Sequence, residues 1–372
     1  MFTRVRRFSE KHRCRLAVHD RSPRQLEVTI GRDAGISQLH AIAIVTVSVD
    51  LDLVMSAGDV FDRYARIDID TDGRKRLSLP FGTKPPYDHA ESVFAVGPSP
   101  NAAVGCARLG VGVSLMAWLG DDETGKKSLE YLQKEGVNTT AVSVKENTPS
   151  STYYVLRLNA DRTILVKNQE FDYAWKAPQK EPEWIYLSLL SDASWQLHQD
   201  LLAYLDDHPK IKLAFQPGTF HFEWGTGKLA HIYRRSYIVV MNREEAADVT
   251  GKSTESVLEL AKALHALGPE IVVITDGPDG AYAYQNDHLT QIPNYPDPVP
   301  PLERTGAGDA FASTVVAALA LGKPIETALR WAPVNSMSVV QKIGAQAGLL
   351  SQQGVEEWLK KAPKDYTTKE LE

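Results

Sequence analysis

The sequence predicts an α/β fold: a doubly wound, mainly parallel sheet flanked by helices, with a small β lid. Strand-like and helical patterns alternate along most of the chain, which is the order that a parallel sheet with helices on both faces requires. The strand-like runs are short and almost entirely apolar, as expected for strands buried on both faces. They lie at 184–190, 211–215, 237–241 and 271–275, with helical patterns at 194–206, 243–249 and 254–267 between them.

The first half of the chain supplies the other predicted elements. Residues 41–57 are apolar and β-branched, which predicts the first core strand. A helix of small residues and then a strand are expected over 101–118, and a charged amphipathic helix over 124–135. Residues 152–166 contain two strand patterns around an Asn-Ala-Asp-Arg turn, which predicts a hairpin that serves as a flap.

The chain is expected to divide into three parts. Residues 1–40 show no convincing strand and are expected to form a poorly ordered extension. One domain is expected over 41–363, with its lid drawn from about 60–96 and 145–170. The C-terminal third is predicted to hold helices near 308–321, 324–341 and 354–361. The tail 364–372 is polar and is expected to fray.

Composition narrows the classes of function. The 41 basic and 47 acidic residues give a formal net charge of −6, which argues against a nucleic-acid partner and favours small polar substrates. The two cysteines are too few for a disulfide scaffold, so a reducing, cytoplasmic compartment is expected. The most apolar run, 42–55, is shorter than the roughly 20 residues that span a bilayer and contains Asp50 and Asp52, so no membrane helix is predicted.

The strongest chemical signal is the run from Thr305 to Phe311, Thr-Gly-Ala-Gly-Asp-Ala-Phe, which opens an apolar helix. The glycines let backbone N–H groups approach a ligand, and the start of the helix adds partial positive charge, so the run predicts an anion hole for a transferring phosphate. Asp309 in the first turn can accept the proton of an attacking hydroxyl. The alternative is that Asp309 only caps the helix and the glycines only shape a turn.

The run resembles the C-terminal signature of the ribokinase-like, or phosphofructokinase-B, carbohydrate kinases. The resemblance extends over about 51–350 through further motifs in the same order. These are the stretch from Val96 to Gly110 with Asn101, the Gly-Asp-Asp-x-x-Gly run at 120–125, Gly136-Val137, Asn-x-x-Glu at 242–245, and Thr-Asp-Gly-x-x-Gly at 275–280.

The resemblance implies a role for each matching residue, with ATP and Mg²⁺ as cofactors. Asp309 is implied as the base, with the anion hole formed by Gly306, Ala307 and Gly308. The residues implied to bind substrate are Gly97, Asn101 and either Asp59 or Asp62. Those implied to line the nucleotide are Asn242, Thr275, Gly277, Gly280, Thr305 and Asn335. Glu245 would serve Mg²⁺ through ordered water. A helix cap at 242–245 and a simple turn at 277–280 are the alternatives.

Some positions depart from the family pattern. Val96 replaces the first Gly of a usual Gly-Gly pair, which affects the hinge between lid and core. Glu303 and Arg304 stand where the family has Asp-Thr, in a loop that holds K⁺ in some members, so Glu303 is a candidate K⁺ ligand. Gln216 stands where an Asp is often seen, and the change is expected to alter an outer contact without reaching the base.

Several choices stay open at this level. Arg157, Arg162 and Lys167 on the flap either grip a phosphate already on the substrate or are solvated charges that discourage strand pairing. His198 and His221, without metal-ligand spacing, are expected to be ordinary surface or half-buried residues. The substrate is a sugar or a nucleoside, for which aromatic lid residues leave room. A non-catalytic sugar or nucleotide regulator is the alternative from another class, and the lid could pair two copies into a homodimer.

Overall fold

The computed structural model describes residues 41–48, 50–56, 65–87, 89–158, 161–188 and 191–371. Their main feature is a ten-stranded sheet in the order β16-β15-β14-β13-β12-β11-β10-β1-β6-β7. The seven strands from β13 to β7 are parallel, while β14, β15 and β16 extend the sheet with antiparallel pairs. The strands are β1 (Ala41–Ser48), β6 (Gly112–Gly120), β7 (Ser143–Lys145), β10 (Trp184–Leu187), β11 (Lys212–Phe215), β12 (Ser236–Asn242), β13 (Ile271–Thr275), β14 (Ala281–Gln285), β15 (His288–Ile292) and β16 (Lys369–Leu371).

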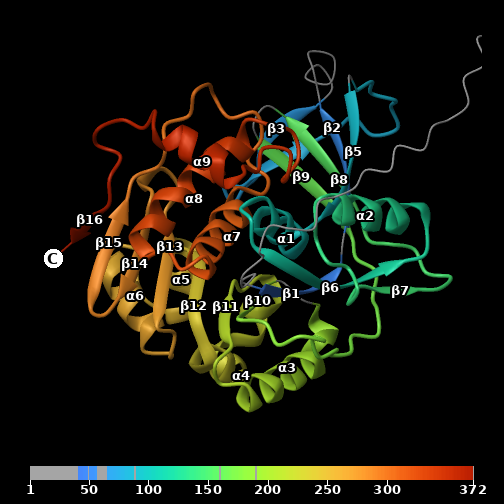
Figure 1. Ribbon diagram of the computed structural model, residues 1–372. Helices are drawn as coiled ribbons and strands as arrows, with labels where there is room; N and C mark the ends of the chain where they lie inside the picture. Colours follow the sequence, from blue (N-terminus) through green and yellow to red (C-terminus); the bar gives the residue numbers. More distant parts are fainter. Residues whose placement is uncertain are drawn as a thin grey trace, which may run out of the picture. The chain divides into compact units, whose positions relative to one another are not determined.

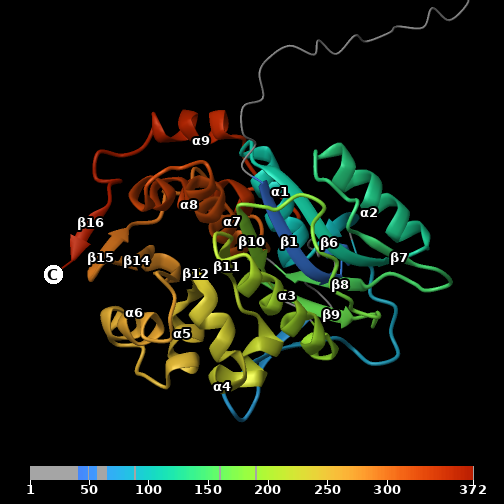
Figure 2. The ribbon, with the colours of Figure 1, turned by 60° about the horizontal axis from the view of Figure 1, so that its bottom comes forward.

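Helices cover both faces of this sheet, as Figures 1 and 2 show. One face carries α1 (Pro98–Arg108), α2 (Glu123–Lys134), α7 (Ala307–Ala320), α8 (Ile325–Val340) and α9 (Gln352–Leu359). The other carries α3 (Trp195–Asp207), α4 (Thr219–Arg235), α5 (Arg243–Thr250) and α6 (Val257–His265). Along β12, Ile238 and Val240 pack into the first layer, and Val239 and Met241 pack into the second, as strand alternation requires. The predicted doubly wound α/β fold is confirmed.

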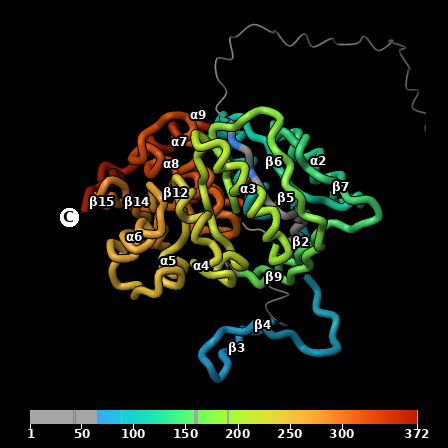
Figure 3. Tube along the Cα trace, turned by 90° about the horizontal axis from the view of Figure 1, so that it is seen from below, coloured from blue at the N-terminus to red at the C-terminus, as the bar shows by residue number. Residues whose placement is uncertain are grey.

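A second sheet contains four strands in the order β5-β2-β8-β9. They are β5 (His89–Val96), β2 (Asp50–Ser56), β8 (Thr152–Leu158) and β9 (Asp161–Lys167). The predicted hairpin is confirmed as the antiparallel pair β8–β9. A separate two-stranded sheet, β3 (Arg66–Ile69) and β4 (Lys75–Ser78), forms the hairpin drawn in light blue in Figure 3. These segments fall largely within the predicted lid, whose closing over a substrate stays a prediction.

The single core strand expected over 41–57 is wrong. The chain instead forms β1 in the central sheet and β2 in the four-stranded sheet. The register between β1 and β6 shifts between Val45 and Ser48, where the chain leaves the central sheet. The residue types agree with this change, because Asp50 and Asp52 are costly in a strand that is buried on both faces.

One further expectation fails in the C-terminal two thirds, and one helix was missed. The tail does not fray: β16 pairs with β15, and Tyr366 is buried with its hydroxyl donating to the Arg330 carbonyl at 2.7 Å. Helix α4 was not predicted, because Gly225 and Gly227 interrupt its helical pattern. Gly225 has φ +73° and marks a kink inside the helix. Among the described residues, no helix is long and apolar enough to cross a membrane.

Candidate active site

The start of α7 forms the floor of the candidate site. Gly306 precedes the helix with φ +80°, and a Cβ there would lie 2.4 Å from the Cβ of Ala345, so no other residue fits. Beyond it, the position of a Cβ on Gly308 has no neighbour within 4 Å, which leaves the first turn open on that side. The N–H groups of a first helical turn lack intrahelical partners and carry the positive end of the helix dipole. This turn is therefore suited to an anion.

Asp309 lies in that first turn and is held by two side-chain amides. Asn101 Nδ2 donates to Oδ2 at 2.8 Å, and Gln216 Nε2 donates to Oδ1 at 3.3 Å. The Gln216 amide is held in turn by the Tyr186 hydroxyl, which donates to its Oε1. Burial raises the pKa of Asp309, and the two amide bonds act in the opposite direction. The expectation that the Gln at 216 affects only an outer contact is wrong, because its amide contacts Asp309 directly.

Asn101 connects this carboxylate to the four-stranded sheet. Its Oδ1 accepts from Gln346 Nε2 at 2.9 Å, and the same nitrogen donates to the Ala95 carbonyl in β5 at 2.6 Å. Gly97 turns the chain from β5 into α1 with φ +116°, and its carbonyl accepts the Asn101 N–H at 2.9 Å. A glycine is needed at that backbone angle. Of the predicted substrate residues, Asn101 thus contacts Asp309, and Gly97 forms the turn that holds Asn101.

A cavity of about 430 Å³ lies next to the start of α7. It brings together the predicted residues Thr275, Gly277, Gly280, Ala307 and Gly308. No sequence pattern indicated its apolar wall, which consists of Pro278, Tyr295, Pro301, Phe311, Pro333, Met337 and Val340. Such a wall with a few polar groups and an anion-binding helix start is suited to a nucleotide.

Asn242 and Glu245 form a reciprocal cap at the start of α5. The Glu245 N–H donates to Asn242 Oδ1 at 2.8 Å, and the Asn242 N–H donates to Glu245 Oε2 at 2.9 Å. Burial raises the pKa of Glu245. The carboxyl also borders a second cavity, of about 480 Å³, that Gln216 lines as well. The helix cap that the sequence left as an alternative is therefore present. Glu245 also lines the same cavity as Gln216, whose amide donates to Asp309.

Comparison with known proteins identifies the family. The model of the pfkB family carbohydrate kinases matches residues 68–352. The ribokinase of Bacillus subtilis is 30% identical over 268 residues, which cover 71% of this chain and 87% of the relative. The chain belongs to the pfkB family of carbohydrate kinases. A 5-dehydro-2-deoxygluconokinase of Bacillus velezensis is 26% identical over 66% of this chain and 80% of its own length.

Solved structures agree on the fold of this carbohydrate kinase. A nucleoside kinase of Methanocaldococcus jannaschii, described as an archaeal member of the ribokinase family, aligns with a TM-score of 0.67 at 18% identity. That alignment covers 87% of this chain and 99% of the other. The ribokinase of Arabidopsis thaliana, solved with ribose and ATP, aligns with a TM-score of 0.66 at 20% identity, covering 86% and 98%. At these identities the likeness establishes the ribokinase-like fold.

Two predicted residues of the kinase, Asn335 and Glu303, are buried in the protein interior. The Asn335 amide is buried, donates to Thr314 Oγ1 at 2.8 Å and accepts the Leu350 N–H at 2.9 Å, so it does not line the nucleotide-sized cavity. Its neighbours Ser336 and Met337 line it instead. Glu303 is 2% exposed and accepts from Thr305 Oγ1 at 2.5 Å and from the Gly344 N–H at 2.9 Å. Glu303 and Thr305 therefore brace the loop that leads to Gly306.

Asp59 and Asp62, the competing substrate residues, lie outside the described residues. No group of three or more His, Cys, Asp or Glu side chains in the described ranges is arranged to hold a metal ion.

His198 and His221 are not the ordinary surface residues that we expected. Both side chains are fully buried, and their Nε2 atoms lie 3.0 Å apart. His221 Nδ1 accepts the Gly218 N–H at 3.1 Å, so its Nε2 carries the proton and donates to His198, whose Nδ1 then donates to the Ser194 carbonyl at 2.8 Å. Burial lowers the pKa of both rings, that of His198 to about 4. The neutral pair anchors the turn that follows Gln216.

Proposed function

We propose that this kinase transfers the γ-phosphoryl group of ATP to a hydroxyl of a sugar or sugar-like small molecule, with Asp309 as general base. The observation that carries the proposal is the Asp309 carboxylate in the first turn of α7. Its two oxygens each accept one amide N–H, and it stands between the substrate residues and the nucleotide-sized cavity.

The arrangement supports base catalysis because both amide donors are neutral. Asn101 and Gln216 orient the carboxylate without protonating it, and each oxygen keeps a further lone pair for an acceptor hydroxyl. Burial raises the pKa of Asp309, which strengthens it as a base. The backbone N–H groups at the start of α7 offer a positive end to the charge that develops on the transferred phosphoryl group.

ATP and Mg²⁺ are the proposed cofactors. In support, the related ribokinase structures include one solved with ATP and another, from E. coli, with ATP and Mg²⁺. Here the cavity lined by Thr275, Gly277 and Gly280 would hold the nucleotide, and Glu245 would bind Mg²⁺ through water. Mg²⁺ would supply charge neutralisation for the phosphates.

K⁺ activation is a separate part of the proposal. Glu303 has replaced the residue at which the family's K⁺ loop begins, and both of its oxygens already accept hydrogen bonds from Thr305 and Gly344. An ion at this loop would therefore bind carbonyl oxygens beside Glu303 and leave its carboxylate as the brace. Initial rates in KCl against NaCl at equal ionic strength test this part. Equal rates would remove K⁺ from the proposal.

The decisive experiment measures ADP release with Mg-ATP across free sugars, sugar acids, sugar phosphates and nucleosides. We expect one acceptor class to stimulate turnover by orders of magnitude, and Asp309→Asn to abolish it. Stimulation by nucleosides alone would establish the nucleoside kinase alternative. If no acceptor stimulates turnover while ATP or a sugar raises the melting temperature, the chain is a binding regulator.

We further propose that the kinase works in the cytoplasm as a homodimer that pairs through the four-stranded sheet. Strand β9 is the edge of that sheet and exposes Leu165 and Val166 at 53% and 57%. Exposed apolar residues on an edge strand favour pairing with another chain. Sedimentation of the wild type against Val166→Lys tests the dimer: a monomeric wild type would refute it.

The proposed cytoplasmic location is supported by the state of Cys106. Burial raises the pKa of its thiol to about 12, which fits a chain without reactive thiols among its described residues.

A further inference from the structure

The inner face of the β8–β9 hairpin carries two arginines side by side. Arg157 in β8 is directly opposite Arg162 in β9. Side chains alternate along a strand, so Arg157 shares its face with Val155, which is fully buried. Lys167, which the sequence grouped with these two residues, falls on the opposite face of β9 by the same alternation. The structure thus separates a pair of cations on the inner face from a single cation on the outer one.

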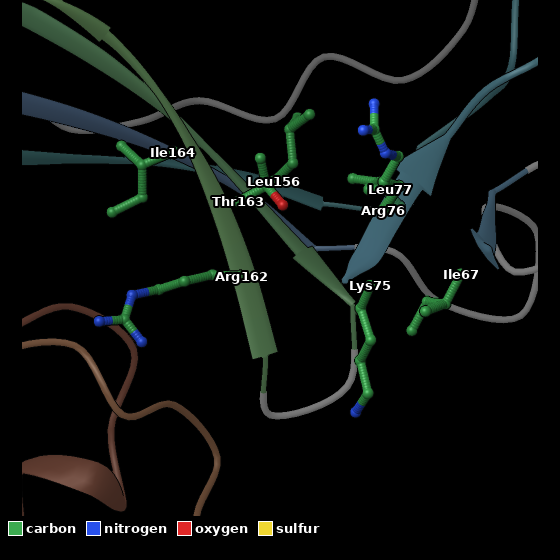
Figure 4. Close-up of a pocket in the computed structure, with 8 residues that line it drawn as sticks. All are labelled: Ile67, Lys75, Arg76, Leu77, Leu156, Arg162, Thr163 and Ile164. Carbon is green, nitrogen blue, oxygen red and sulfur yellow. The ribbon is translucent and has the colours of Figure 1, made fainter. Parts of the chain in front are cut away.

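The inner face is directed at the loop that leads to the anion hole. Arg157 Nη1 donates to the Leu302 carbonyl at 3.3 Å, four residues before Gly306. Figure 4 shows Arg162 and Ile164 on one side of the hairpin and Leu156 and Thr163 on the other, toward Leu77. Arg162 points to the side on which the ribbon coloured as the C-terminal part of the chain lies. Both guanidinium groups are therefore on the active-site side of the four-stranded sheet.

The pair lacks an ion-pair partner among the side chains that the structure describes. Among the described side chains, neither Arg157 nor Arg162 makes an ion pair, whereas the nearby Arg76 is paired with Asp70 at 2.8 Å. Like charges directly opposite each other on paired strands destabilise a sheet. The described side chains supply no negative charge to offset this juxtaposition, and an added oxyanion would relieve it. Two guanidinium groups also match the planar, bidentate geometry of a carboxylate or a phosphate.

Two observations favour the acceptor over the nucleotide as the source of such an oxyanion. The nucleotide-sized cavity is lined only by residues from 275 to 340 and by none from the four-stranded sheet. That sheet instead leads through β5 and Gly97 into α1, where Asn101 donates to the Asp309 carboxylate. We propose that Arg157 and Arg162 bind an anionic group on the acceptor, so that this kinase phosphorylates a sugar that already carries a carboxylate or a phosphate. This inference rests on the proposed kinase function.

The test compares matched acceptors: a neutral aldose, the aldonic acid of the same carbon skeleton, and its terminal phosphate. We expect the wild type to prefer one anionic acceptor, and Arg157→Gln and Arg162→Gln each to raise its KM by about tenfold or more with little change in kcat. Arg162→Lys should recover part of the loss because it restores the charge. Lys167→Gln, on the other face of the same hairpin, should change KM less than twofold.

Each other outcome has a defined meaning. A wild type that prefers the neutral aldose, or Arg variants that match Lys167→Gln, would overturn the subsite and leave the kinase function standing. A rise in KM for ATP rather than for the acceptor would assign the pair to the nucleotide and equally overturn it. If no acceptor is phosphorylated, the proposed function fails and the subsite fails with it. The preferred anion among the two decides between a sugar acid and a sugar phosphate.

Discussion

The buried pair of His198 and His221 makes the stability of the kinase sensitive to mild acid. In the folded chain, burial lowers the pKa of His198 from 6.5 to about 4. Below pH 6.5 the unfolded chain therefore binds a proton that the folded chain does not, and unfolding becomes easier as the pH falls. The His198 contribution is complete near neutral pH and is lost progressively between pH 6.5 and about 4.

The size of the change in stability follows from the shift in the pKa of His198. The full shift, from 6.5 to about 4, corresponds to about 3 kcal/mol of unfolding free energy. Between pH 7 and pH 5 it amounts to about 2 kcal/mol. His221, whose pKa is also lowered, adds in the same direction. Carboxyl groups elsewhere in the chain titrate over the same pH range. The quantity to measure is therefore the difference in unfolding free energy between the wild type and a variant that lacks the His198 imidazole.

The assay is equilibrium urea unfolding at pH 7, 6 and 5 for the wild type and His198→Gln. The variant is expected to be less stable at pH 7, because it disturbs the bonds to Ser194 and His221. We expect this deficit to shrink by about 2 kcal/mol at pH 5, since the variant has no imidazole at that site to protonate. His231→Gln, which removes an exposed imidazole near Asp206, is the control. A deficit that stays constant within about 0.5 kcal/mol would refute a neutral buried pair.

Three further changes test other parts of the structure. Gln216→Leu removes a donor that lowers the pKa of Asp309, so the acid limb of the kcat profile should move to higher pH and activity at neutral pH should fall about tenfold; an unmoved limb would contradict the contact. Gly306→Ala forces a Cβ against Ala345 at φ +80°, so it should lower the unfolding free energy by about 2 to 4 kcal/mol and remove most of the activity. The control Gly308→Ala adds a Cβ that meets no neighbour and should leave the unfolding free energy unchanged. Tyr366→Phe should lower the unfolding free energy by about 1 kcal/mol, and no change would argue that the tail is not packed.

The sequence predicted best the features that depend on residues close together along the chain. The order of strands and helices in the second half follows from short apolar runs, and the start of α7 follows from glycines at fixed spacing. Part of the same motif pattern proves structural: a Cβ on Gly120 would lie 2.0 Å from the Thr148 carbonyl, and one on Gly125 would lie 2.1 Å from the Gly120 carbonyl. A glycine signature therefore marks close backbone contacts whether or not a ligand is involved.

Contacts between distant segments were beyond the reach of sequence patterns. Gln216 and Asp309 are 93 residues apart, and the imidazoles of His198 and His221 meet only because α3 and α4 pack together. Asn335 was wrongly assigned to the nucleotide site: its helix lines the cavity, but its own side chain faces the core. Successive residues of a helix point to different sides, so choosing the neighbouring position in the sequence assigns the wrong side chain to the cavity.

The residue at position 216 connects these observations. A carboxylate there, as the family often has, would stand beside Asp309 and raise its pKa through like charge. The amide of Gln216 has the opposite effect, because its Nε2 donates to Oδ1 while Tyr186 fixes its Oε1. Burial and amide donation therefore oppose each other at Asp309. An anionic acceptor, as we propose, would add a negative charge to this region, and a neutral amide at 216 together with Arg157 and Arg162 on the β8–β9 hairpin would accommodate that charge.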